Sequence, residues 1–146
     1  MSYSRIVLAG VAGVVAFYIH GFIVFGKLIA NDYNPYLAVY RTSDTVIHYM
    51  PIGFLCTLIG TVVLALIYAK GYEGGRGIVE GLRFGLLIGL FVAMVCVGEN
   101  YVTLNIGGKL ALEQAVGTLT GWTVVGVVIG LIYKPTVPSA GSSTSR

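Results

Sequence analysis

The sequence predicts an all-α fold, a bundle of four helices that cross a membrane, and three observations support this prediction. Of the 146 residues, 56% are hydrophobic and only 10% are charged, with a mean hydropathy of +0.87, whereas soluble domains are about one quarter charged. Four apolar runs approach the length of about 20 residues that a helix needs to cross a bilayer. They lie at residues 6–29, 47–68, 82–97 and 110–133. The short connections between them leave little chain for a domain outside the membrane.

With their flanking residues included, the runs predict helices that together make one membrane domain, 1–135. The expected helices are 5–30, 46–69, 78–102 and 110–133. The first run is too long for the core of a signal peptide, so we expect a retained helix. The third run is short by itself, so its polar neighbours must snorkel or face protein. The tail, 136–146, is rich in Ser, Pro and Gly and is expected to be flexible.

The cations in the short connections predict the orientation. Lys27, Arg41 and Lys109 fall on one side, and five cations fall on the other: Arg5, Lys70, Arg76, Arg83 and Lys134. The richer side is expected to be cytoplasmic. The protein would then lie in a bacterial inner membrane with both termini in the cytoplasm. Tyrosines near both boundaries, among them Tyr68 and Tyr133, predict an interfacial belt.

The most specific pattern is a row of glycines in the third span. Gly77, Gly81, Gly85 and Gly89 recur every fourth residue. Glycine weakens a helix by about 1 kcal/mol relative to alanine, and such rows allow a neighbouring helix to approach closely. The fourth span carries two further pairs, Gly117/Gly121 and Gly126/Gly130, nine residues apart and therefore on opposite faces. Either both faces pack inside the bundle, or one of them meets a second chain.

A weak internal repeat relates the second and fourth spans. A shift of 65 residues aligns Leu66-Ile67-Tyr68 with Leu131-Ile132-Tyr133. The two halves could then be parallel helical hairpins related by a pseudo-two-fold axis along the membrane normal.

Polar residues inside or beside the apolar spans are the candidate functional residues. They are His20, His48, Glu99, Asn100 and Glu113. Glu113 shares a helical stripe with Gly117 and Gly121. In one interpretation His20 and Glu99 form a buried structural pair. In the others, the histidines bind a haem or pigment, or the His and Glu residues carry protons or a small solute.

Recognisable catalytic and metal-binding patterns are otherwise absent from the sequence. There is no GxSxG, P-loop or HExxH motif, and no basic run typical of nucleic-acid binding. Cys56 and Cys96 lack CxxC spacing and are expected to be inert packing residues. The sequence therefore predicts neither an enzyme nor a metal site.

Several short motifs resemble a group of small bacterial four-span integral membrane proteins. They are Gly71-Tyr72-Glu73-Gly74-Gly75, Glu80-Gly81-Leu82-Arg83-Phe84-Gly85, His20-Gly21 and Leu131-Ile132-Tyr133-Lys134-Pro135. The resemblance implies the four-span topology, and no activity is attached to it.

Together these features predict an accessory or structural subunit of a larger membrane complex. Its partners would be the lipid bilayer and other membrane subunits, or further copies of itself. The alternative is a homo-oligomeric channel or transporter for protons or small solutes. The long outer loop, residues 30–45, is the expected contact with a partner.

Overall fold

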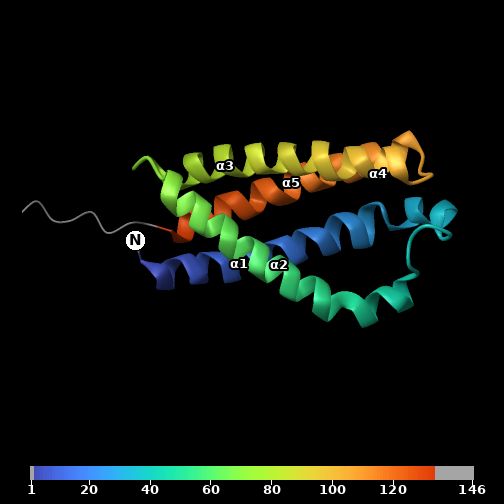
Figure 1. Ribbon diagram of the computed structural model, residues 1–146, viewed down its shortest axis with the longest axis horizontal. Helices are drawn as coiled ribbons and strands as arrows, with labels where there is room; N and C mark the ends of the chain where they lie inside the picture. The colour runs from blue at the N-terminus through green and yellow to red at the C-terminus, as the bar shows by residue number, and fades with distance from the viewer. Residues whose placement is uncertain (1, 134–146) are drawn as a thin grey trace, which may run out of the picture.

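Long apolar helices make up the molecule, as seen in a computed structural model that describes residues 2–133 (Figure 1). The helices are α1 (Tyr3–Ile23), α2 (Ser43–Gly71), α3 (Gly77–Val92), α4 (Gly98–Thr103) and α5 (Gly108–Ile132). The π-helical segment Val24–Leu28 extends α1, and a second one, Ala93–Val97, joins α3 to α4. A 3-10 segment, Ala30–Tyr36, follows the first π-helical segment.

Four of the helical runs are long and apolar enough to cross a membrane. They are Tyr3–Leu28, Asp44–Gly71, Gly77–Thr103 and Gly108–Ile132. The predicted all-α bundle of four candidate membrane spans is therefore confirmed. The third span reaches its length because the helix continues through its π-helical segment to Thr103. The predicted flexible tail, 136–146, lies outside the described residues.

The bundle has two distinct ends (Figure 1). The start of α1, the turn between α2 and α3, and the end of α5 lie at one end, which we call the terminal end. The connections 29–42 and 104–107 lie at the opposite end, the loop end. Within the bundle, α5 packs against both α3 and α1, and α1 also packs against α2.

The packing does not reproduce the predicted two-fold relation. Such a relation would exchange α1 with α3 and α2 with α5, so the α1–α5 contact would need a matching α2–α3 contact. Instead, α2 and α3 meet through the rings of Tyr68 and Phe84, with centroids 5.4 Å apart, whereas α1 packs extensively on α5. The repeated Leu-Ile-Tyr triplet nevertheless brings its two tyrosines together, since the rings of Tyr68 and Tyr133 lie 6.1 Å apart and perpendicular.

The glycine row of α3 lies directly against the backbone of α5. A Cβ atom on Gly85 would lie 2.7 Å from the carbonyl oxygen of Trp122, and one on Gly89 would lie equally close to that of Leu119. Gly77 and Gly81 face the carbonyl oxygens of Gly130 and Gly126 in the same way. Because any side chain would collide with these atoms, the row lets the two helices pack backbone to backbone.

The other glycine pair of α5 is used by α1. A Cβ atom on Gly117 would lie 2.8 Å from the Phe25 ring, and one on Gly121 would lie 3.0 Å from Nδ1 of His20. Both faces of α5 therefore pack inside the chain. Of the two arrangements that the sequence allowed, the structure shows the intramolecular one.

A hydrophobic core fills the terminal end of the bundle. It contains Ile6, Ala9, Ala65, Tyr68, Val125, Ile129 and Tyr133. Tyr68 and Tyr133 are only 4% and 3% exposed, so the prediction that they belong to an interfacial belt is wrong. Their neighbours are other aromatic rings, which give edge-to-face contacts worth about 0.5–1.5 kcal/mol each.

Towards the loop end, α2 separates from the rest of the bundle (Figure 1). Gly10 and Gly21 lie on the same face of α1, because eleven residues are close to three full turns. A Cβ atom on Gly10 would lie 2.7 Å from the Val62 backbone, whereas one on Gly21 would meet nothing within 4 Å. Residues 44–56 of α2 are exposed without exception, and the contacts within this segment include Tyr18 against Phe54 and the Arg41 guanidinium over the Tyr49 ring.

The α3–α5 contact predicts a sharp effect of side-chain size. Gly85→Leu should separate α3 from α5, because a leucine side chain cannot fit between backbones that already touch. We expect a lower melting temperature and a lower yield of folded protein in detergent, measured by circular dichroism and size-exclusion chromatography. Leu86→Ile, one residue away on an exposed position, should have little effect. Equal stability of the two variants would contradict the packing.

Candidate functional site at the loop end

The polar side chains of the loop end gather where the 3-10 segment meets the first turns of α5. The Lys109 ammonium lies 2.6 Å from the Asp32 carboxylate and 3.5 Å from the Glu113 carboxylate. Lys109 itself is exposed, but one oxygen of Glu113 is buried and makes no hydrogen bond within the described chain. The bridge therefore ties the 30–36 segment to α5 while water screens much of its charge.

Gln114 forms the buried part of this cluster. It is 8% exposed, and its amide nitrogen donates to the hydroxyl oxygens of both Tyr33 and Tyr40, at 3.1 Å each. The two rings meet edge to face with centroids 5.0 Å apart. One glutamine thus anchors two positions of the 30–42 connection to α5.

The Tyr33 hydroxyl remains neutral in this setting. Burial raises its pKa above the ordinary value, against the effect of the Gln114 hydrogen bond, and Tyr40 and Glu113 add to the increase. Tyr33 therefore acts at neutral pH as a hydrogen-bonding group and not as an anion.

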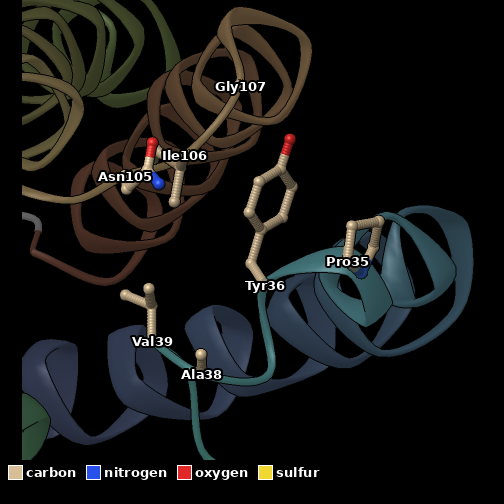
Figure 2. Close-up of a pocket in the computed structure, with 7 residues that line it drawn as sticks. All are labelled: Pro35, Tyr36, Ala38, Val39, Asn105, Ile106 and Gly107. Carbon is tan, nitrogen blue, oxygen red and sulfur yellow. The ribbon is translucent and has the colours of Figure 1, made fainter.

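A shallow pocket of about 350 Å³ opens beside the cluster (Figure 2). It is lined by Pro35, Tyr36, Ala38, Val39, Asn105, Ile106 and Gly107. The Tyr36 ring stands between the two connections, and its hydroxyl approaches Gly107. No charged side chain lines the pocket, and its polar side chains are the Tyr36 hydroxyl and the Asn105 amide.

Of the five predicted polar residues, the structure brings only Glu113 into the loop-end cluster. His20 instead lies at the α1–α5 contact, where its Nε2 is 3.0 Å from the Thr120 hydroxyl oxygen. That hydroxyl donates its hydrogen to the Val116 carbonyl at 2.9 Å. With its hydrogen placed there, the hydroxyl oxygen can accept a hydrogen bond from an Nε2–H of the His20 ring.

The predicted pair of His20 with Glu99 is wrong, and the reason is their depth in the bundle. Gly89 already lies opposite Leu119, at the level of His20 and Thr120. Glu99 follows Gly89 by ten residues, roughly 15 Å further along the helix axis. It is exposed on α4, near the loop end.

The remaining predicted residues also stand apart. His48 bonds through Nδ1 to the carbonyl of Asp44 in its own helix, at 3.0 Å, and Asn100 is exposed on α4. Within residues 2–133, no group of three or more His, Cys, Asp or Glu side chains could hold a metal ion. The two histidines come from different helices and have different local partners, so the structure does not bring them together as a pair of haem ligands.

The cysteines differ from the prediction as well. Cys56 and Cys96 are free thiols, and both are exposed on the outside of the bundle. They do not fill the core, although each lies within a helical run that is apolar enough to cross a membrane.

Sequence reasoning missed Gln114, Tyr33 and Tyr40 as a unit, although one signal was available. Gln114, Gly117 and Gly121 are spaced by three and four residues, which is the inward stripe of α5, and all three are buried. Glu113 is four residues from Gly117 and lies at the edge of the same stripe. The uncharged amide was overlooked in favour of the neighbouring carboxylate.

Replacing Gln114 should loosen the loop end. In Gln114→Leu the two tyrosine hydroxyls lose their common donor, and we expect a loss of roughly 1–3 kcal/mol in the free energy of unfolding. Hydrogen–deuterium exchange over residues 30–42 should increase, while the α3–α5 contact stays protected. Leu112→Ala, at an exposed position of the same helix, serves as the control. Unchanged exchange over residues 30–42 would show that Gln114 does not hold the connection.

The histidine contact predicts which double variant is non-additive. His20→Leu and Thr120→Val each remove one side of the same hydrogen bond, so their effects on stability should overlap by about 0.5–1.5 kcal/mol. His20→Leu and Glu99→Leu should instead be additive, since these side chains are far apart. Thermal unfolding of the singles and doubles measures both quantities. The reverse pattern would restore the His20–Glu99 pair.

Comparisons with known proteins identify no relative. No family model, no curated protein and no solved structure matches the chain.

The motif Gly71-Tyr72-Glu73-Gly74-Gly75, one of those behind the resemblance, has a structural role in the α2–α3 turn. Tyr72 donates to the Gly75 carbonyl at 2.8 Å and the Glu80 carboxylate accepts from the Gly75 amide, which closes the α2–α3 turn around Gly74 at φ +91°. The chain is thus placed by its fold, as a four-span membrane protein.

Proposed function

We propose that this protein has no enzymatic activity of its own and serves as an accessory or structural subunit, packing against a partner helix in a larger membrane complex. The observation that carries the proposal is an uncovered face of α2. This α2 face consists of Tyr49, Gly53, Cys56, Gly60, Val63 and Ile67. The spacings between them alternate between four and three residues, as in the contact seam of two helices.

The α2 face has the chemistry of a helix contact. Its centre is small, with Gly53, Cys56 and Gly60, and its ends carry larger side chains that are about half exposed. A Cβ atom on Gly60 would meet nothing within 4 Å, and one on Gly53 would touch only the Tyr18 hydroxyl, at 3.4 Å. Exposed glycines cost helix stability, and close approach of a partner helix would offset that cost.

This support differs from the one that the sequence offered. The two glycine pairs of α5 suggested one face for the bundle and one for a partner, but α3 and α1 occupy both. The uncovered small residues are instead on α2. The predicted partner contact through the outer loop also has less support, because Tyr33, Tyr40 and Asp32 bind that loop to α5.

The alternative, a homo-oligomeric channel, has no comparable support. A proton or solute route needs polar groups that follow one another across the membrane. His20, His48 and Glu113 each have a local partner in a different place. Glu99 is exposed on α4, about 15 Å past the level of His20 along the helix axis.

We also propose an inner-membrane location with both termini in the cytoplasm, supported by the five-to-three cation bias. In a variant without its native cysteines, Asn34→Cys should react with an impermeant thiol reagent in intact cells, and Gly74→Cys should not.

A size change on the α2 face tests the proposed association. Gly60→Leu should shift the protein from a larger assembly to its monomer mass on native gels of membranes extracted in mild detergent, because the side chain blocks close approach. Its helical circular dichroism and melting temperature should stay unchanged, since Gly60 touches no other helix of the chain. Gly98→Leu is the matched control, a glycine with equally open surroundings on α4. A monomeric wild type, or an assembly indifferent to Gly60→Leu, would overturn the proposal.

A further inference from the structure

The separation of α2 from α1 leaves a tapered gap at the loop end. The Tyr18 and Phe54 rings form a contact between the two helices, with centroids 5.5 Å apart. Beyond that contact, Gly21 of α1 meets nothing within 4 Å. Residues 44–56 of α2 cover more than three helical turns and are exposed on every side. From the Tyr18–Phe54 contact towards the loop end, α1 and α2 diverge (Figure 1).

The dimensions of the gap match one leaflet of a bilayer. From Phe54 to Asp44, α2 advances by ten residues, or about 15 Å at 1.5 Å per residue. Half of a hydrocarbon core about 30 Å thick is also about 15 Å. Exposed apolar side chains along this length include Ile47, Met50 and Phe54 on α2 and Phe22 on α1. A flexible acyl chain can fill such a taper, whereas a helix about 10 Å across cannot enter its narrow end.

Two cations flank the open end of the gap. Lys27 lies at the end of the α1 helical run, with its ammonium 5.3 Å from the centre of the Phe22 ring. Arg41 precedes α2, with its guanidinium 4.0 Å from the centre of the Tyr49 ring. The rings hold both side chains near the membrane boundary, as amphipathic cations commonly lie.

Neither cation forms an ion pair with the described residues, in contrast to Lys109, which bridges Asp32 and Glu113. Asp44, the nearest acidic residue in sequence to Arg41, is paired with neither of them. His48, one turn later, bonds to a carbonyl of its own helix. By sequence position, Asp44 is one carboxylate beside the two cations Lys27 and Arg41, which leaves a local excess of one positive charge at the open end.

From this combination we infer a binding site for an anionic phospholipid. An acyl chain lies in the gap between α1 and α2, and Lys27 and Arg41 hold the headgroup phosphate at its open end. Basic residues at the boundary between membrane helices bind anionic headgroups by this chemistry. The site goes beyond the proposed function, because its lipid lies between α1 and α2; it shares with the α2 face the ring of Tyr49, over which the Arg41 guanidinium lies. Bound lipid would stabilise residues 44–56 of α2, which are exposed in the bundle.

The test compares anionic with zwitterionic lipid on the purified full-length chain. Thermal unfolding is measured in nanodiscs of phosphatidylcholine alone and of phosphatidylcholine with phosphatidylglycerol, and native mass spectrometry counts retained phosphatidylglycerol. The wild type should melt at a higher temperature with phosphatidylglycerol, because a ligand that binds the folded state stabilises it. Lys27→Gln with Arg41→Gln should lose at least half of that difference and most of the retained lipid.

Two further variants separate a specific site from general charge attraction. Arg76→Gln with Arg83→Gln removes two cations towards the terminal end and should keep the full difference. Gly21→Leu places a side chain in the gap, at a position where a Cβ atom would meet nothing within 4 Å, so it should reduce lipid retention while the melting temperature in phosphatidylcholine alone stays the same. The inference is overturned if the Lys27/Arg41 double variant keeps the full difference, or if the Arg76/Arg83 variant loses as much. A photo-crosslinker at position 21 that captures a polypeptide in native membranes, in place of lipid, would also overturn it.

Discussion

The contact between the backbones of α3 and α5 determines how the rest of the bundle is arranged. Four glycines, spaced every fourth residue, leave one face of α3 without side chains, so the carbonyl groups of α5 lie directly against it. Only that face allows such an approach, which sets the rotation of α3. The pairing of Gly77 with Gly130 at one end and of Gly89 with Leu119 further along sets its axial position. Because one side of α5 is then occupied, its other side must receive α1, and the pair Gly117/Gly121 makes room there for Phe25 and His20.

The connection after α1 has a different anchor, and this affects α2. Asp32, Tyr33 and Tyr40 bind the first loop to Lys109 and Gln114 of α5. The loop is therefore held against α5. In contrast, α2 begins at Ser43 away from its neighbours and reaches α1 near the Tyr18–Phe54 contact. Residues 44–56 of α2 are left exposed. Both proposals concern this helix because α1, α3 and α5 already pack against one another. One proposal concerns the outward face of α2, and the other concerns its gap with α1.

The polar groups of the spans show why a chemical site was expected and why the geometry does not assemble one. In a low-dielectric setting each polar side chain needs a partner close by. His20 finds one in Thr120 on the adjacent helix, and His48 uses a carbonyl one turn earlier in its own helix. These bonds satisfy each group locally, and within residues 2–133 they do not join into a continuous chain of polar side chains across the bundle.

The sequence by itself determined the fold class, the four spans and the close contact of the α3 glycine row with another helix. These features depend on local composition and on spacing along a single helix, since hydrophobic length decides whether a segment spans a membrane and a four-residue period decides which residues share a face. The bounds came out within a few residues, for example 46–69 predicted against Ser43–Gly71 observed. Only the tertiary structure decided which groups meet. The His20–Glu99 prediction failed because helix depth depends on how α3 and α4 are placed against α5. Gln114 was missed because its partners lie 81 and 74 residues away in a loop. The separation of α2 likewise follows from a loop anchored on α5, since long-range contacts of this kind leave no periodic signal in the chain.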